Sequence, residues 1–336
     1  MTAEALKALF YPFDAETLAA PAKDARVLFL GAEPGFRLPE GFAAEVHCVQ
    51  GFRPHVRALE AAGRQVAPRA DGEGYGAALV LAGRHRGQNE LWIAEALERV
   101  APGGLILVAG SKDDGIASLR KRIGVLVDVE DALPKYHGLA FWFRCPVEKD
   151  AAATLREANP PVLVDGRFRT SPGMFSHEKI DAGSKLLVEN LPEGVSGRVA
   201  DFCAGWGYVA AEVAARSKSL KALDLYEADF EAVEAAKKNV QAECPVRFFW
   251  RDLIAEPVEE RYDWIFMNPP FHQGRAAEPD IGVALIKAAA KALKSGGRLA
   301  MVANRQLPYE ATLAASFSTA GELARDNRFK VLLARR

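Results

Sequence analysis

The feature that most constrains this chain is a helix followed by two glycines and an apolar strand, a pattern that occurs twice. It occupies residues 97–110 and again residues 291–304. Around each copy, short apolar runs alternate with segments whose apolar residues recur every three or four positions. Strands that alternate with helices indicate βαβ units and a parallel sheet. The sequence therefore predicts an α/β fold that is built twice, by duplication of one domain.

The expected elements fall into two halves. We place the linker at 145–161, because it ends in Asn159-Pro160-Pro161 and prolines interrupt regular structure; the expected domains are 1–150 and 160–336. In the first half, strands are expected at 26–31, 44–49, 77–82 and 105–109, and helices at 55–62 and 89–100. In the second half, strands are expected at 197–202, 220–226, 246–250, 264–267 and 298–303, and helices at 209–217, 230–241 and 281–293.

Charge and composition exclude some classes of protein. The 336 residues include 43 Lys and Arg against 44 Asp and Glu, whereas a protein that holds nucleic acid through its overall field is usually basic. RNA binding would therefore need locally concentrated charge. No apolar run reaches the roughly 18 residues that span a bilayer, and the N-terminus does not resemble a signal peptide. We expect a cytoplasmic protein without a metal, because the cysteines are scattered and form no CxxC pair: Cys48, Cys145, Cys203 and Cys244.

A candidate nucleoside-binding loop lies in the second half. Asp201-Phe-Cys-Ala-Gly205-Trp-Gly207 follows a strand and opens a helix, where glycines let a ligand approach helix N–H groups. Glu227, at the end of the next strand, can accept hydrogen bonds from both ribose hydroxyls. Cys203 stands where such loops usually have a glycine, and Asp252 could accept from an adenine amino group. The predicted cofactor-binding residues are Asp201, Cys203, Ala204, Gly205, Gly207, Glu227, Asp252, Leu253 and Asn268.

The deciding motif is Asn268-Pro269-Pro270-Phe271, directly after an apolar strand. Two consecutive prolines lock φ and remove two N–H donors, so the Asn268 side-chain oxygen and the Pro269 carbonyl become fixed acceptors. Together they can take both hydrogens of a planar NH₂ group and aim its nitrogen at an incoming methyl. Phe271 offers a stacking face, worth about 1–3 kcal/mol per base. We predict these four residues to be catalytic, chiefly through placement of the substrate.

Three other interpretations remain open from the motifs. The same tetrapeptide type serves adenine N6 and the glutamine side-chain amide of proteins, so the amino group could belong to either. Cys203 could instead mark a decayed cofactor loop in an RNA-binding protein. A nicotinamide dehydrogenase shares the pattern of strand, turn, helix and acid, but it leaves Asn268–Phe271 unexplained.

Residues 165–336 resemble the catalytic half of the bacterial rRNA guanine-N2 methyltransferases, of the small-subunit RsmC type and its large-subunit relative. The resemblance lies in pieces that occur in order along the chain: Gly173-Met-Phe-Ser176, Asp181-x-Gly183-Ser184, the Asp201 loop, Asn-Pro-Pro-Phe-His272, Gly296-Gly297, Val302-Ala-Asn304, Leu307-Pro308-Tyr309 and Arg328-Phe329-Lys330-Val331. Residues 1–150, including Lys135-Tyr136-His137-Gly138, match more weakly.

The resemblance implies two tandem Rossmann-like class I methyltransferase domains, each with a mostly parallel seven-stranded sheet flanked by helices. It also implies S-adenosylmethionine as cofactor and a guanine N2 of 16S rRNA as target, with 23S rRNA as the alternative. In that family only the second domain is active. The first half agrees, because Val49-Gln50-Gly51 lacks the acid and residues 82–86 replace the Asn-Pro-Pro-Phe motif.

A local basic rim could supply the phosphate contacts that a near-neutral chain needs. Arg275 and Arg328 also flank the expected pocket in sequence, whereas the 84–86 segment is a weaker candidate, since exposed basic loops are usually only solvated. The expected partner is ribosomal RNA, in the small subunit, bound by a monomer. The predicted substrate-binding residues are Phe175, Phe271, Arg167, Arg169, Arg305 and Lys330.

Overall fold

The computed structural model describes residues 2–270, 272–273, 276–277 and 279–336. The chain divides into two compact units, Met1–Pro160 and Pro161–Arg336, and each is described here by itself.

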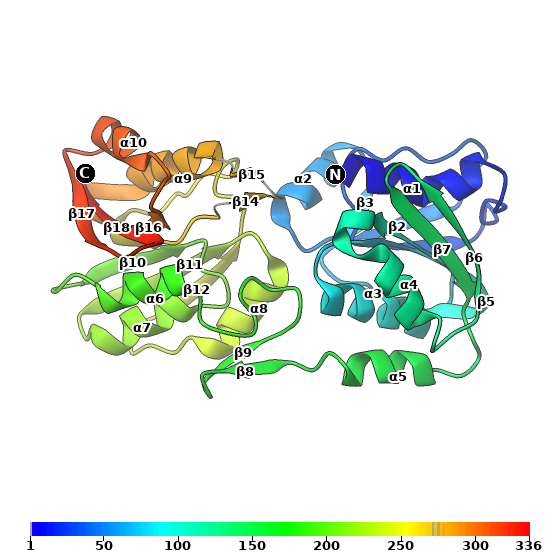
Figure 1. Cartoon of the computed structure of the whole chain (residues 1–336). Helices are drawn as coiled ribbons and strands as arrows, with labels where there is room; N and C mark the ends of the chain where they lie inside the picture. The colour runs from blue at the N-terminus through cyan, green and yellow to red at the C-terminus, as the bar shows by residue number, and fades with distance from the viewer. Residues whose placement is uncertain (1, 271, 274–275, 278) are drawn as a thin grey trace. The chain divides into compact units, whose positions relative to one another are not determined.

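The N-terminal unit is a seven-stranded sheet covered by helices on both faces (Figure 1). Its strand order is β3-β2-β1-β4-β5-β7-β6, with β7 antiparallel to both of its neighbours. The strands are β1 (Arg26–Leu30), β2 (Glu45–Val49), β3 (Gln65–Ala67), β4 (Tyr75–Ala82), β5 (Val100–Ser111), β6 (Val129–Lys135) and β7 (Gly138–Arg144). The helices are α1 (Thr2–Asp14), α2 (Arg53–Ala61), α3 (Arg86–Arg99), the 3-10 turn η1 (Lys112–Asp114), α4 (Ile116–Ile123) and α5 (Asp150–Glu157).

The C-terminal unit repeats this topology. Its main sheet has the order β12-β11-β10-β13-β16-β18-β17, with β18 antiparallel to both neighbours. Its strands are β10 (Gly197–Phe202), β11 (Leu220–Glu227), β12 (Val246–Trp250), β13 (Tyr262–Met267), β16 (Leu293–Asn304), β17 (Thr319–Arg325) and β18 (Phe329–Arg335), beside the small pairs β8 (Val162–Val164) with β9 (Phe168–Thr170) and β14 (His272–Gln273) with β15 (Ala276–Ala277). Its helices are α6 (Ala182–Glu189), α7 (Tyr208–Arg216), α8 (Phe230–Asn239), α9 (Pro279–Ala292) and α10 (Tyr309–Ser316).

The prediction of two mostly parallel, Rossmann-like sheets is confirmed. Parallel pairing links the first five strands of each sheet. Each sheet then ends in two antiparallel strands, β7 and β6 in the first unit and β18 and β17 in the second. No strand was expected from the sequence at these positions. The carboxyl ends of the parallel strands share one edge, where ligands bind in open α/β sheets.

The paired glycines of the repeated pattern lie inside the strands β5 and β16. They do not stand just past the end of a helix, where a glycine would terminate it. In each sheet the register slips at this point, between Tyr262 and Trp264 in the second. Gly103 and Gly296 have φ of +80° and +73°, a region that side chains rarely adopt. The two copies therefore share an unusual local backbone, as expected of a repeated unit.

The predicted linker is shorter than expected, because helix α5 occupies much of it. Leu155 of α5 is buried, and the side chain of Asn159 donates a hydrogen bond to Glu90 of α3 at 2.7 Å. A buried amide with a partner secures the segment to the N-terminal unit. The chain passes between units at Pro160 and Pro161.

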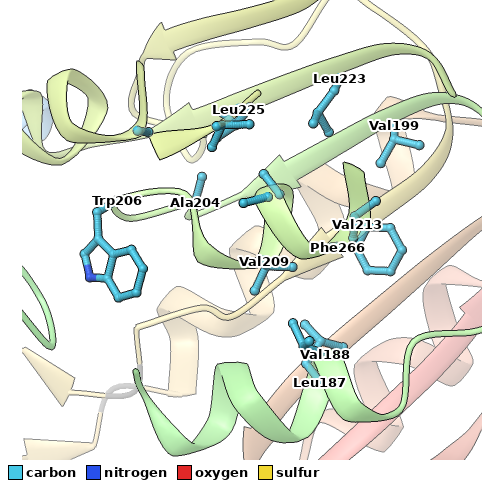
Figure 2. Packing of buried hydrophobic residues seen from close by; sticks show 14 of the residues in the cluster. Leu187, Val188, Val199, Ala204, Trp206, Val209, Val213, Leu223, Leu225 and Phe266 are labelled. Carbon is cyan, nitrogen blue, oxygen red and sulfur yellow. The ribbon is translucent and has the colours of Figure 1, made fainter. Parts of the chain in front are cut away.

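The core beneath the carboxyl edge of the C-terminal sheet is apolar and tightly filled (Figure 2). Val199, Leu223 and Phe266 project from β10, β11 and β13 toward α7 and α6, where they meet Val213 and Leu187. Burying such side chains contributes roughly 1.5–3 kcal/mol each. This layer fixes the strand ends that carry the polar residues described below.

Two further observations concern the described residues alone. None of their helices combines the length and the apolar character needed to cross a bilayer. Among the same residues, His, Cys, Asp and Glu side chains form no group of three or more that could hold a metal ion.

Candidate active site

A pocket opens at the carboxyl edge of β10 and β13 in the C-terminal unit. It collects residues from the loop after β9, the start of α6, the loop from β10 to α7, and the end of β13. Polar groups and aromatic rings converge there, as is usual in small-molecule sites. Its lining comprises Phe175, Ser176, Asp181, Ser184, Asp201, Cys203, Ala204, Gly205, Trp206, Tyr208, Val209 and Asn268.

The predicted cofactor loop has the backbone of a ligand-binding turn. Cys203, Gly205 and Gly207 have φ of +59°, +53° and +93°, so Cys203 adopts a conformation that favours glycine. A Cβ at Gly207 would lie 2.5 Å from the Cγ2 of Val240. Gly207 is therefore required for close packing of the loop on α8, and Gly205, with open space around it, is the glycine that leaves room for a ligand.

Glu227 holds the cofactor loop from the neighbouring strand. One carboxylate oxygen accepts from the backbone N–H of Gly205 at 2.8 Å, and the other accepts from Ala228 at 2.7 Å and Asp229 at 2.9 Å. Burial raises its pKa, although these three hydrogen bonds oppose the rise. The acid predicted to bind a ribose thus also fixes the turn beside the pocket.

Asp201 is a second buried acid at the pocket. Its side chain accepts from the N–H of Ala210 at 3.0 Å and is 2% exposed. Burial, aided by the nearby charge of Glu227, raises its pKa to about 8. Burial and these two carboxyl groups also raise the pKa of the Cys203 thiol well above its usual value, so Cys203 remains a neutral thiol. A positively charged ligand bound beside these acids would favour their ionised forms.

Asn268 lines the pocket, and its side-chain nitrogen is held by two partners. Its Nδ2 donates to the Oδ2 of Asp181 at 3.0 Å and to the Oγ of Ser184 at 2.7 Å. Within the described part of the chain, its Oδ1 is shielded from solvent and has no hydrogen-bond partner. A buried acceptor without a donor costs about 1–3 kcal/mol, which a ligand with an N–H group would recover. Of the other predicted catalytic residues, Pro269 is buried and Pro270 exposed, and Phe271 lies outside the described residues.

Four predicted cofactor residues are not part of the pocket lining: Gly207 and Glu227, described above, and Asp252 and Leu253. Asp252 is mostly buried in a turn, where its Oδ1 accepts from the N–H of Ile254 at 3.0 Å. Leu253 packs its side chain into the apolar core, so only its backbone could serve a ligand. The cofactor-binding roles predicted for Asp252 and Leu253 remain proposals.

Phe175, predicted to contact the substrate, lies at the pocket with 63% of its surface exposed. Its carbonyl accepts from the indole N–H of Trp206 at 3.0 Å. Asn239 of α8 braces the same region, because its Nδ2 donates to the carbonyls of both Trp206 and Arg169 at 2.9 Å. Sequence reasoning missed Trp206 and Asn239, because their hydrogen bonds join residues that are 31 or more positions apart in the sequence.

The predicted basic rim is only partly available. Arg169 and Arg305 are exposed, but Arg167 pairs with Glu212 at 2.8 Å. Lys330 corrects the prediction: its ammonium pairs with Glu310 and the residue is 5% exposed, because Lys330 lies in strand β18 beside β16. A buried, paired cation cannot offer its charge to a phosphate. Arg275 lies outside the described residues.

Sequence reasoning also gave no role to the residues that hold Asn268. Asp181 caps helix α6 by accepting from the N–H of Ser184 at 2.8 Å. An Asp ahead of an apolar helical run is a visible capping signal. Its contact with Asn268, 87 residues away, follows from the fold and has no local signature.

Comparison with known proteins agrees with this geometry. Residues 165–333 match the family described as methyltransferase small domain. The chain is 36% identical to the ribosomal RNA small subunit methyltransferase C of Psychromonas ingrahamii, over 71% of this chain and 70% of that one. It is 32% identical to the protein of the same name from Shewanella pealeana, over 70% of each.

A solved structure extends the likeness to both units. The T. thermophilus 16S rRNA N2 methyltransferase RsmC, in complex with AdoMet and guanosine, superposes with a TM-score of 0.80 at 26% identity, and the match covers 99% of this chain and 91% of that one. With identity above 30% over more than two thirds of its curated relatives, this chain belongs to the RsmC family of ribosomal RNA small subunit methyltransferases.

Proposed function

We propose that this protein transfers a methyl group from S-adenosylmethionine to the exocyclic N2 amino group of a guanine in 16S rRNA. The observation that carries the proposal is the buried Oδ1 of Asn268, a residue of the pocket lining, which has no hydrogen-bond partner among the described residues. The two N–H groups of guanine N2 are donors, and one of them fits that acceptor. Family membership and the activity of the T. thermophilus relative support the same reaction.

The residues fit the cofactor that the family implies. Asp201 is buried at the pocket and Glu227 is partly buried beside it. A positively charged ligand there would stabilise their ionised forms, and Gly205 leaves open space for it. We propose that Asp201 and the 203–207 loop hold the amino acid part of the cofactor, while Glu227 takes the ribose hydroxyls. Asp252 and the backbone of Leu253 would hold the adenine.

The cofactor supplies a methyl group already activated by a positively charged sulfur, so no side chain has to act as a nucleophile. The chain must place the amine and keep its nitrogen lone pair directed at the methyl. Asn268 Oδ1 accepts one N–H, and the carbonyl of Pro269 accepts the other. Placement of this kind can supply about 7–11 kcal/mol of a barrier when the geometry is near that of attack.

Phe175 and Phe271 are proposed to stack on the target base, and Arg167, Arg169 and Arg305 to contact phosphates around it. Phe175 is exposed at the pocket, which suits a base that has left its helical stack. Arg167 would have to exchange Glu212 for phosphate. We also propose that the assembled small subunit is the substrate, that the enzyme acts as a monomer, and that it acts in the cytoplasm.

The experiment is methyl transfer from labelled S-adenosylmethionine to purified substrates, followed by nucleoside mass spectrometry. Small ribosomal subunits from cells that lack this protein should yield N2-methylguanosine. Large subunits, naked 23S rRNA and release factors are the comparison substrates. A label that appears only in N6-methyladenosine, or only in protein, would overturn the proposal.

A further inference from the structure

The side-chain amide of Asn268 has two ends, and the proposed reaction needs the oxygen end in the pocket. Turned by 180° about its last bond, the same side chain would present an NH₂ donor. A donor at that point would repel an amino group and attract a carbonyl oxygen. The choice between these two orientations therefore decides which functional group the site accepts.

Two residues on helix α6 settle that choice. Asp181 begins the helix as its N-cap, and Ser184 lies one turn later. The Oδ2 of Asp181 accepts from Asn268 at 3.0 Å and the Oγ of Ser184 accepts at 2.7 Å, so both Nδ2 hydrogens are used. An ionised carboxylate can only accept hydrogen bonds, which excludes the turned orientation at this position.

We propose that Asp181 and Ser184 are positioning residues that hold the Asn268 oxygen toward the pocket and so make the site selective for an amino group. The proposal rests on the proposed function, since it explains how that function distinguishes guanine N2 from a base without the amino group. Neither residue has to touch the substrate.

Burial supports a rigid arrangement. Ser184 is 9% exposed, and α6 packs on the sheet through Leu187 and Val188. A Cβ on Gly183 would lie 3.1 Å from the Oδ2 of Asp181, so the helix start approaches the carboxylate closely. Because buried polar groups without partners are costly, the three-residue cluster has one arrangement in which every Nδ2 hydrogen is bonded.

The test compares the binding of guanosine and inosine by calorimetry, with S-adenosylhomocysteine present. Inosine differs from guanosine in lacking the N2 amino group. The wild-type protein should prefer guanosine by about tenfold or more, because a site built for an N–H group rejects the analogue that lacks it. A wild type without any preference would count against the proposed function and, with it, this inference.

Asp181→Ala should reduce the preference to about threefold or less, since the Ser184 hydroxyl can then donate to a turned amide. Asp181→Asn should retain most of the preference, because its amide oxygen can occupy the same position. Asp229→Ala is the matched control: Asp229 caps α8 by accepting from Ala232 at 2.9 Å, and among the described residues its side chain forms no hydrogen bond with Asn268. It should lower thermal stability and leave the preference unchanged.

If wild type prefers guanosine and Asp181→Ala keeps the full preference, the positioning role is wrong while the proposed function stands. An equal loss in Asp229→Ala and Asp181→Ala would also overturn it, since cap loss alone would then explain the effect. Should Asp181→Ala fail to fold, Asp181→Ser decides. A serine hydroxyl can still cap the N–H of Ser184, but it can donate as well as accept and so no longer excludes the turned amide. A full preference in that variant would overturn the inference.

Discussion

The two units share a topology but differ at the carboxyl edge of their sheets. Leu30 ends β1 and Phe202 ends β10, and each pairs with the last or nearly last residues of its two neighbouring strands. In the next strand along the chain, β2 or β11, the residue that follows the paired end is Gln50 in the first unit and Glu227 in the second. The acid that fixes the cofactor loop is thus an amide in the N-terminal unit.

The same register identifies two further replacements. Phe29 of β1 corresponds to Asp201, and Leu81 of β4 corresponds to Asn268. Phe29 and Leu81 are buried in an apolar cluster, in which Phe29 meets Phe36 edge to face with ring centroids 5.2 Å apart. Apolar packing therefore occupies positions that are polar in the C-terminal unit.

The loop after β1 shows a similar contrast. Gly31 and Cys203 both have positive φ. A Cβ at Gly31, however, would lie 2.6 Å from the ring of Trp92. The Trp92 ring therefore lies against the turn. We infer that the N-terminal unit does not bind the cofactor. Because the two units share a fold, this difference depends on a few residues at the strand ends.

The largest expected effect comes from removing Asn268. Asn268→Ala should lower turnover by about 100-fold or more, because one fixed acceptor for the target amine is lost, while cofactor affinity stays within about threefold. Methyl transfer to small subunits and calorimetry with S-adenosylhomocysteine measure the two quantities. Wild-type turnover in this variant would refute the assigned role.

The matched change in the other unit is Leu81→Ala. It should lower the free energy of unfolding by about 2–5 kcal/mol, since it empties a buried leucine site, and leave the rate per folded molecule unchanged. Denaturant unfolding and active-site titration separate the two. A loss of rate comparable with that of Asn268→Ala would break the contrast between the units.

Exchanging the strand-end acid and amide should have the next largest effect. Glu227→Gln leaves one acceptor oxygen facing loop N–H groups where the carboxylate has two, so the Kd for S-adenosylmethionine should rise about tenfold or more. Equilibrium binding measures the change. An unaltered Kd would contradict the role given to Glu227.

The reverse exchange, Gln50→Glu, should not create a second site. The Nε2 of Gln50 donates to the carbonyl of Ala32 at 2.7 Å, and a carboxylate cannot replace that donor. We expect a lower melting temperature and no gain in bound cofactor. A second binding event in the titration would show that the N-terminal unit retains a latent cofactor site.

The smallest predicted effect concerns pH. The pKa of Asp201 rises on folding from 3.8 to about 8, so between these values the native state retains a proton that the unfolded chain loses. This acid therefore destabilises the fold increasingly as pH rises from about 4 to 8, and the penalty is constant above that. Asp201→Asn, which can still accept from Ala210, should gain stability relative to wild type across this window.

Thermal unfolding of the two proteins without cofactor, at pH 5 and pH 8, checks this. The difference in melting temperature should grow in favour of Asp201→Asn at the higher pH. A difference that is the same at both values would mean that Asp201 is ionised in the native state throughout. Phe29, at the same place in the first unit, carries no such pH-dependent cost.

The sequence predicted the parallel strands except β3, and the helices α2, α3, α7, α8 and α9, because these have continuous apolar runs or helical periodicity. It did not predict the antiparallel strands β6, β7, β17 and β18, and in β6 and β17 most residues are exposed at a sheet edge. Such strands form because β7 and β18 offer them hydrogen-bonding partners. Their existence depends on tertiary context and leaves little trace in local pattern.

The site followed the same rule. Asn268, the Asp201 loop and Glu227 could be predicted, since each sits at a strand end with a recognisable spacing. Lys330 could not be placed correctly, because its burial depends on a partner, Glu310, brought near by a helix. Likewise, the contact between Asp181 and Asn268 exists only once α6 packs beside β13's end.

We expect the protein to have a single cofactor site, in the C-terminal unit. Calorimetric titration of the full chain with S-adenosylmethionine tests this most directly. We predict one molecule bound per chain, weakened in Glu227→Ala and unaffected in Gln50→Ala. Two molecules per chain, or binding that survives in Glu227→Ala and disappears in Gln50→Ala, would contradict it.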